Sequence, residues 1–334
     1  MVYVVDMKEG YNIIKRITLI KKERKGILYI ILFTIILAII RPFIGPYWSF
    51  IVAYGLIISI VGLGFNLLLG YNGLLSFGHA GMFGIGMYTL GLCTKYFNIS
   101  SLEILILLSI IIGLIIIIGL GYVASKLIIV YFALFMLSFG QIIFALTYKL
   151  YGITGGSDGL SIPILTILNI NFNSRIDFLY CYYYFVLLIF TICTIFMWIL
   201  VNSPFGKTLQ AIKVDDIRAT YIGVPVRKYR YIAFIISTLY AVISGALYGP
   251  LNGFIYPELI SHVFSGEIVY LTLLGGMNYF AGPIVGSFIY TILKVYIPTI
   301  TEYWQFIMGA TLIIMILLFP GGIVGWIYSK FKKR

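Results

Sequence analysis

The sequence predicts an all-α polytopic membrane protein with about ten transmembrane helices, some of them broken by glycine-rich segments. Hydrophobic residues make up 61% of the 334 residues and charged residues only 10%, whereas a soluble globular domain carries about 25% charged residues. The apolar residues also gather in runs that approach the roughly 20 residues a helix needs to cross a bilayer. Composition and run length together exclude the soluble enzyme classes.

The apolar runs follow one another with short polar or glycine-rich connections. The third run and the eighth and ninth runs are the weakest candidates because glycines interrupt them, and each glycine destabilises a helix by about 1 kcal/mol relative to alanine. The predicted spans are residues 27–46, 48–69, 79–97, 102–122, 127–150, 177–201, 229–250, 264–281, 283–299 and 303–327.

Basic residues orient these spans. Lysine and arginine gather in the N-terminal tail 1–26, in the loop 203–228 and in the C-terminal tail 328–334, and an even number of spans places all three on one side. Loops rich in lysine and arginine stay in the cytoplasm. We therefore expect a multi-pass protein of the plasma (cytoplasmic) membrane with both termini inside and residues 27–327 as its transmembrane domain. The net charge of +12 is then a topological signal, and no nucleic-acid partner is expected.

Residues suited to catalysis or metal binding are sparse. The three cysteines lack the spacing of a metal site and two histidines cannot form a multi-histidine site, so no metal site and no catalytic residues are expected. Gly206-Lys207-Thr208 imitates the end of a phosphate-binding loop, but the glycine required five residues before the lysine is Asn202. Glu267 suits a helix start, where the dipole stabilises a carboxylate, and snorkelling explains Lys294. The sequence offers no series of buried acids that would carry protons or sodium ions, which disfavours an ion-coupled transporter.

Two glycine-rich segments, residues 70–86 and 274–286, interrupt the apolar runs in corresponding regions of the two halves. Glycine lets helices approach closely and lets a helix break where it lines a cavity. Paired breaks are typical of transporters with internal repeats and a site near the midplane. Close packing alone is the alternative for any single glycine, and His79 alone is better explained as a hydrogen-bonded structural residue. The candidate substrate-pathway residues are Gly73, Ser76, Phe77, Gly78, His79, Gly275, Gly276 and Asn278.

A further glycine-rich segment, residues 152–163, is predicted on the side opposite the basic loops. Its glycine, serine, aspartate and proline residues predict a series of turns. It is either an ordinary loop or an outer mouth that meets a delivery partner, for which the candidate residues are Thr154, Gly155, Gly156 and Gly159.

The basic loop 203–228 contains an amphipathic pattern. Phe205, Leu209 and Ile212 share one face of a helix, with lysines off that face. A fully solvated loop has no need of such an apolar stripe. The helix either lies on the membrane surface or docks on a partner.

Taken in order, these segments resemble the branched-chain amino acid permeases of the ABC importers, of the LivM type. The resemblance extends from residue 55 to residue 325, and the ordered combination of motifs carries it. The motifs are Gly-Tyr-Asn-Gly-Leu-Leu-Ser-Phe-Gly-His-Ala-Gly at 70–81, Thr154-Gly155-Gly156 with Gly159-Leu160, the loop from Ser203 to Gly223, Gly275-Gly276 with Gly282-Pro283 and Gly286, and Phe319-Pro320-Gly321-Gly322-Ile323-Val324-Gly325.

The resemblance implies a set of partners. These are a second permease subunit, two cytoplasmic ATP-binding subunits that use ATP and magnesium, and an external substrate-binding protein, besides the surrounding membrane lipids; this chain would bind no cofactor. The loop 203–228 is similar to the segment that docks on the ATPase. Ala219 and Gly223 match its Ala-x-x-x-Gly core, whereas Ile217 and Arg218 depart from the usual residues. The ATPase-coupling candidates are Phe205, Gly206, Lys207, Leu209, Ile212, Arg218, Ala219 and Gly223.

The function that the resemblance implies is inward movement of leucine, isoleucine or valine, driven by ATP that other subunits hydrolyse. Backbone groups of broken helices would replace water around the charged ends of the amino acid. The same architecture carrying urea, short amides or another amino acid is the nearest alternative, because permeases of this type share the motifs. An ion-coupled secondary transporter working alone is the next, and a membrane enzyme or a pure scaffold is more distant.

Overall fold

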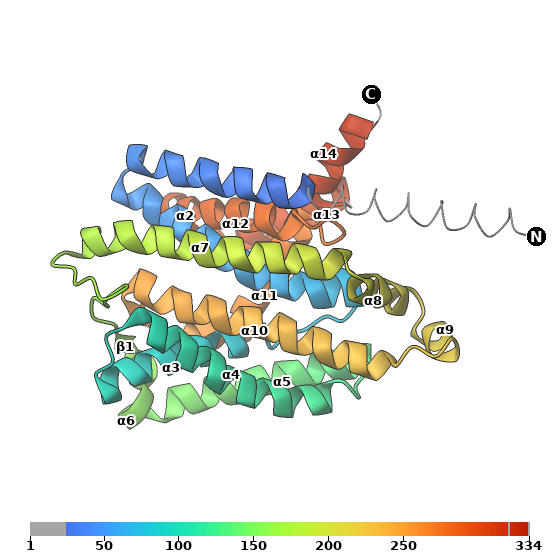
Figure 1. Cartoon of the computed structure of the whole chain (residues 1–334), viewed down its shortest axis with the longest axis horizontal. Coiled ribbons are helices and arrows are strands. Elements are labelled where there is room, and N and C mark those ends of the chain that lie inside the picture. Colours follow the sequence, from blue (N-terminus) through green and yellow to red (C-terminus); the bar gives the residue numbers. More distant parts are fainter. Residues whose placement is uncertain (1–24, 320, 333–334) are drawn as a thin grey trace, which may run out of the picture.

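The computed structural model describes residues 25–319 and 321–332, which form a bundle of helices lying side by side (Figure 1). The described part begins with a helix at Lys25–Phe43, here called the N-terminal helix, whose last turn is η1 (Arg41–Phe43). The elements that follow are α2 (Pro46–Asn66), the π-helical turn η2 (Leu67–Asn72), α3 (His79–Phe97), α4 (Leu102–Ala124), α5 (Ile129–Lys149), α6 (Tyr151–Thr154), η3 (Gly156–Asp158), β1 (Leu160–Ser161), α7 (Arg175–Asn202), α8 (Pro204–Val214), α9 (Asp216–Tyr221), α10 (Val226–Asn252), β2 (Phe254–Ile255), η4 (Pro257–Ile260), α11 (His262–Gly275), α12 (Gly282–Ile300), α13 (Trp304–Leu318) and α14 (Gly322–Lys332).

The bundle has two distinct ends. The short helices α8 and α9 extend beyond one end, and β1 lies at the other (Figure 1). The two strands form a small antiparallel ladder in which Leu160 faces Ile255 and Ser161 faces Phe254. We call these the α8 end and the β1 end.

The predicted fold class is confirmed, and a helix lies in each of the ten predicted spans. Among the described residues, seven helices are long and apolar enough to cross a membrane, and α11 and α13 are shorter. The eighth predicted span ends early, because Gly276 adopts a φ of +111° that terminates α11. The tenth divides into α13 and α14 at the Phe319–Gly322 segment, where Gly322 has a φ of +70°.

Helix α2 is the centre of the bundle. Of its most apolar stretch 94% is buried, compared with 72% for α10, 17% for α5 and 6% for the N-terminal helix. Helix α10 packs against α2, α3 and α4, and α2 also packs against α7 and α12. The core therefore lies between α2, α3 and α10, whereas α5 and the N-terminal helix leave most of their surface for lipid or for other chains.

The crossing of α3 and α10 depends on glycine. A β-carbon on Gly86 would overlap the carbonyl oxygen of Val242, and one on Gly245 would overlap that of Phe83. Ala241, Gly245 and Gly249 form a row of small residues at four-residue spacing in α10, the pattern that lets helix backbones touch. At Gly245 the backbones of α10 and α3 are in direct contact.

Candidate functional site

The first glycine-rich break carries α3 into the interior of the bundle. After η2, residues 73–78 are not helical, and α3 begins at His79, whose side chain is completely buried. His79 Nδ1 lies 2.9 Å from Ser76 Oγ, and Nε2 lies 2.9 Å from Ser237 Oγ on α10. Ser237 in turn donates to the carbonyl oxygen of Gly64 at 2.6 Å. The break is thus tied to both α10 and α2.

This network assigns the protonation of His79. The single hydroxyl proton of Ser237 goes to Gly64, so Ser237 accepts from His79 Nε2–H. Nδ1 then accepts from the hydroxyl of Ser76, and a neutral imidazole satisfies every partner. His79 therefore acts here as a structural residue that fixes the start of α3.

Removing the Ser237 hydroxyl tests this role. Ser237→Ala leaves the buried Nε2–H without an acceptor, and we expect a loss of about 1–3 kcal/mol in stability, read as a lower thermal midpoint of the detergent-purified protein. Ser59→Ala on α2 is the control, because its equally buried hydroxyl bonds only to the carbonyl of Gly55 within the same helix. Equal midpoints for the two variants would contradict the assigned network.

Helix α11 also begins inside the bundle. The chain leaves α10 at the β1 end, pairs β2 with β1, and then runs inward through η4 along α3, where Ile260 contacts the backbone at Gly84. Ser265, in the first turn of α11, accepts a hydrogen bond from the Ala80 N–H at 3.2 Å. Phe83 and Phe264 pack with their ring centroids 4.9 Å apart. The first turns of two helices thus meet within the bundle, and η4 is a re-entrant segment.

Helix geometry places this meeting point near the middle of the bundle. The hydrogen bonds of His79 extend to Gly64, which lies in the continuous helix formed by α2 and η2. At a rise of 1.5 Å per residue, Gly64 is about 12 Å from the Asn72 end of this helix and about 27 Å from its Pro46 end. By the same measure Gln141 lies about 18 Å from the start of α5 and about 12 Å from its end. Both levels fall within a hydrocarbon core of about 30 Å.

Polar side chains are exposed at this level. Gln141 Nε2 lies 3.4 Å from His262 Nδ1 at the start of α11. His262 and the nearby Glu258 of η4 are exposed, and Gln141 is half-buried. We call Gln141, Glu258 and His262 the mid-bundle polar patch. Exposed polar and charged side chains at membrane depth are costly against lipid and usually face a water-filled cavity or another protein surface.

A largely buried ion pair lies just over one helical turn further along α11. Lys294 Nζ of α12 lies 2.6 Å from Glu267 Oε2, and Tyr290 also donates to that oxygen. Glu267, Tyr290 and Trp304 border a cavity of about 210 Å³ between α11, α12 and α13. The snorkelling interpretation of Lys294 is therefore wrong: its ammonium group turns inward to a carboxylate rather than outward to the membrane surface.

The second glycine-rich break lies elsewhere. Gly275 packs against the backbone of Gly282, and Gly276 against that of Gly321 and Gly322. Nearby, a β-carbon on Gly70 would overlap the carbonyl oxygen of Met277. This contact and the Lys213 ammonium, which donates to the Gly70 carbonyl at 2.8 Å, place this break at the α8 end.

The predicted pathway residues therefore occupy two levels. Ser76, Gly78 and His79 lie deep in the bundle and are buried or closely packed, while Gly73 contacts Lys213 at the α8 end. Gly275 and Gly276 are buried at the α8 end, where Asn278 is exposed. The expectation that both breaks meet near the midplane is not met, because the second break joins α11 to α12 at one end.

Helix α8 has the predicted amphipathic character. Leu209 and Ile212 are buried against the bundle, and Phe205 stacks on Tyr229 of α10 at 5.4 Å. Gly206 packs against the carbonyl of Val201, so a side chain cannot be accommodated there. Lys207 is exposed on the outer face. The apolar stripe thus fixes α8 to the ends of α7 and α10.

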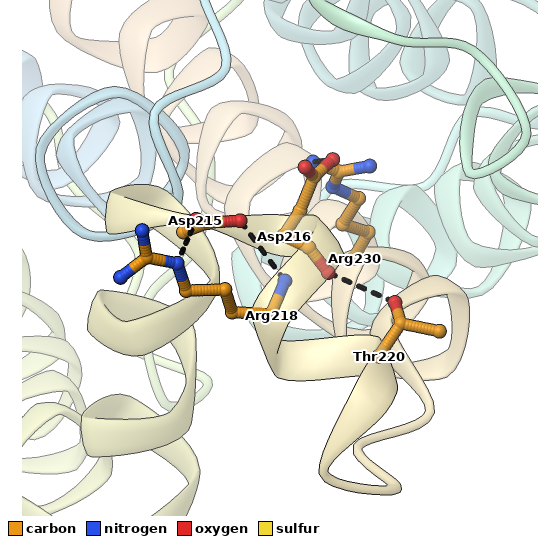
Figure 2. A network of polar contacts seen from close by, with 5 residues as sticks. All are labelled: Asp215, Asp216, Arg218, Thr220 and Arg230. Atoms are coloured by element: carbon orange, nitrogen blue, oxygen red, sulfur yellow. Dashed lines mark hydrogen bonds and ion pairs between the residues drawn. The ribbon is translucent and has the colours of Figure 1, made fainter.

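Ion pairs hold the following helix, α9, as Figure 2 shows. Asp215 accepts from the Arg218 backbone N–H at 2.9 Å and pairs with its guanidinium at 2.8 Å. Asp216 pairs with the nearly buried Arg230 of α10 at 2.9 Å. Ala219 packs inward, and Gly223 ends the segment with a φ of +87°. The Asp216–Arg230 pair thus joins α9 to α10.

Large apolar side chains project from this loop. Val214, Ile217, Tyr221 and Ile222 are 86%, 64%, 85% and 79% exposed. We call these four residues the α9 apolar surface. An open groove of about 890 Å³ lies beside it, between α9 and the ends of α4 and α10. Exposed apolar side chains gathered in this way are typical of interaction sites.

The glycine-rich loop at the β1 end is tightly folded. Thr154 donates to the carbonyl of Thr147 at 2.6 Å, and Gly155 and Gly159 have φ values of +76° and +68°. A β-carbon on Gly159 would overlap the carbonyl oxygen of Ile255, so the loop packs directly on the start of the re-entrant segment. Tyr151 donates to Asp158 at 2.5 Å, and this hydrogen bond raises the pKa of the tyrosine.

The sequence interpretation missed the mid-bundle polar patch and the α9 apolar surface. Gln141 is a lone amide in an apolar run, which was a usable signal. Glu258 and His262 sit in a polar stretch that also fits an ordinary surface loop, so only the fold shows their depth.

Residues 47–316 match the family described as the branched-chain amino acid transport system permease component. The chain belongs to this family. The match covers the transmembrane helices from α2 to α13 and includes both glycine-rich breaks and the loop that carries α8 and α9.

Two relatives extend the match beyond the family region. The chain is 27% identical over 322 residues to the high-affinity branched-chain amino acid transport system permease protein LivM of Escherichia coli (strain K12), covering 86% of this chain and 74% of the relative. It is 26% identical over the same length to the protein of that name from Salmonella typhimurium (strain LT2), with the same coverage. No solved structure matches the chain.

Proposed function

We propose that this chain is a membrane-spanning subunit of an ATP-driven importer that moves leucine, isoleucine and valine into the cell. Membership of the permease family and the likeness to two LivM proteins support this substrate class. The α8 end faces the cytoplasm, since the basic loop 203–228 lies there. The partners are a second permease subunit, two ATP-binding subunits that use ATP and magnesium, and an external binding protein.

The mid-bundle polar patch is the observation that carries the proposal. Gln141, Glu258 and His262 lie at membrane depth on the outside of the chain, where lipid would leave them unsolvated. A water-filled pathway between this chain and the second permease subunit would solvate them. A zwitterionic amino acid needs such polar partners in place of water, and the re-entrant η4 supplies backbone groups beside them.

The α9 apolar surface provides the connection to ATP hydrolysis. Its four side chains are exposed on a loop that ion pairs and the buried stripe of α8 fix to α7 and α10. A force applied to this surface is therefore transmitted to α10, and through α10 to α3 at the glycine crossing. We assign the surface to contact with the ATP-binding subunits.

Thiol accessibility tests the pathway. In a chain whose native cysteines are replaced by alanine, Gln141→Cys and His262→Cys are expected to react with a charged, membrane-impermeant thiol reagent in the assembled transporter, and leucine is expected to slow the reaction. Ile115→Cys on α4 is the control, because this residue is 68% exposed at similar depth on an apolar face. Equal reactivity at all three positions, or none at any, would refute a pathway at the mid-bundle polar patch.

Charge introduced on the α9 apolar surface tests the coupling. The double variant Ile217→Glu and Tyr221→Glu is expected to lose the ATP-binding subunits during purification. It is also expected to lower ATP-driven uptake at least tenfold, because burying an unpaired polar group in the contact costs about 1–3 kcal/mol. Ser329→Glu on the exposed part of α14 serves as the control. Normal recovery of the ATP-binding subunits with the double variant would count against this assignment.

A further inference from the structure

An apolar groove runs along the outside of the bundle between the N-terminal helix, α7 and α12. Its volume is about 710 Å³, and it is lined by side chains that are almost all aliphatic or aromatic. Tyr29, Phe33, Phe190, Trp198, Phe280 and Ile284 are among them. The one hydroxyl group besides that of Tyr29 belongs to Thr194, which is buried and has no hydrogen-bond partner.

Contacts at both ends attach the N-terminal helix to α7, and between them Phe33 meets Phe288 of α12 edge to face, with ring centroids 6.3 Å apart. At the α8 end, Gly26 is so close to Trp198 that a β-carbon would overlap the indole ring. Towards the β1 end, Tyr183 donates to the carbonyl oxygen of Leu37 at 3.0 Å, and the Arg41 guanidinium lies 3.6 Å from the centre of the Tyr180 ring. Of the most apolar 18-residue stretch of this helix, 6% is buried.

The groove has the length of one membrane leaflet. Its lining on the N-terminal helix extends from Gly26 to Leu37, which is roughly 16 Å at 1.5 Å per residue. Half of a hydrocarbon core is about 15 Å. The groove begins at the α8 end, where a membrane surface lies, and its lining on the N-terminal helix ends at Leu37. If the groove were empty, the side chains that line it would lose van der Waals contacts. Water does not fill apolar spaces of this kind. A lipid acyl chain is therefore the occupant that fits the groove best.

A basic residue, Lys25, lies at the open end of the groove. Lys25 is exposed next to Gly26, and the sequence directly before it adds Lys21, Lys22 and Arg24. Basic clusters next to a transmembrane helix attract anionic lipid, at about 1 kcal/mol for each basic residue. We propose that one anionic phospholipid of the α8-side leaflet binds here, with an acyl chain in the groove and its phosphate near Lys25. This site is independent of the transported substrate.

Native mass spectrometry of the full chain, purified in mild detergent and mixed with equal phosphatidylglycerol and phosphatidylcholine, tests the proposal. We expect one tightly retained phosphatidylglycerol. Ile284→Trp fills the groove and is expected to abolish retention, whereas Ile115→Trp on the exposed face of α4 is expected to keep it. Changing Lys21, Lys22, Arg24 and Lys25 to glutamine is expected to reduce the preference for phosphatidylglycerol about tenfold or more.

A second measurement covers the case in which Ile284→Trp fails to fold. Phosphatidylglycerol with a photoreactive group in its acyl chain is expected to label wild-type peptides from residues 26–37 and 280–289. Labelling confined to other helices, no retained lipid, or equal retention by wild type and a folded Ile284→Trp variant would overturn the proposal. Equal retention of both lipids would overturn the role of the basic residues.

Discussion

Gly245→Leu is expected to eliminate folded protein from detergent extracts of the membrane. Gly245 lies where α10 crosses α3, and a β-carbon there would overlap the carbonyl oxygen of Phe83. Backbone on the other side cannot move aside as a flexible side chain would, so the two central helices would have to separate. Overpacking of this kind costs 1–3 kcal/mol when side chains adjust, and we expect a larger loss where they cannot.

Gly119→Leu provides the matched control for this prediction. Gly119 is also a helical glycine, on α4, but nothing lies within 4 Å of the β-carbon position there. Fluorescence-detected size-exclusion chromatography of tagged variants is the measurement. We expect a symmetrical peak for Gly119→Leu and aggregate or no peak for Gly245→Leu. Similar peaks for both variants would show that the α3–α10 crossing is looser than the structure indicates.

Lys294→Met is expected to destabilise the protein by about 3–5 kcal/mol, because it leaves the Glu267 carboxylate largely buried without its cation. The two side chains are only 25% and 16% exposed, and the Lys294 Nζ to Glu267 Oε2 distance is 2.6 Å. Tyr290 still donates to Glu267, but one neutral hydrogen bond does not replace a positive charge.

The double variant Lys294→Met with Glu267→Gln separates the charge effect from the change of shape. Replacing both members removes the unpaired charge, so we expect the thermal midpoint of the double variant to recover most of the loss. Thermal unfolding of the detergent-purified proteins is the measurement. A double variant less stable than Lys294→Met alone would mean that the ion pair itself contributes little and that packing dominates.

The sequence was sufficient for the features that repeat locally. Apolar runs of membrane-spanning length predicted a helix in every span. The three-residue stripe of α8 was also readable, because helical periodicity places Phe205, Leu209 and Ile212 on one face. These predictions depend only on neighbours within a few turns of the same helix.

Features made by distant residues could not be predicted in this way. His79 and Ser237 are 158 positions apart, and Glu267 and Lys294 are 27 apart, so their pairing exists only in the folded bundle. The re-entrant course of η4 has no composition of its own that distinguishes it from a surface loop. The position of the second glycine-rich break was misjudged for a related reason: glycines serve equally well for a pathway and for the tight backbone packing that Gly275 and Gly282 make.

ATP-driven uptake of radiolabelled leucine tests the proposed function most directly. The tagged chain would be purified with its partners from native membranes and reconstituted into liposomes, with ATP and magnesium on the side of the α8 end and binding protein on the other. We predict uptake that requires ATP and that unlabelled isoleucine and valine compete for. The double variant Ile217→Glu with Tyr221→Glu is expected to lower this uptake at least tenfold. Uptake by the chain alone, driven by a proton or sodium gradient without ATP, would contradict the proposed function.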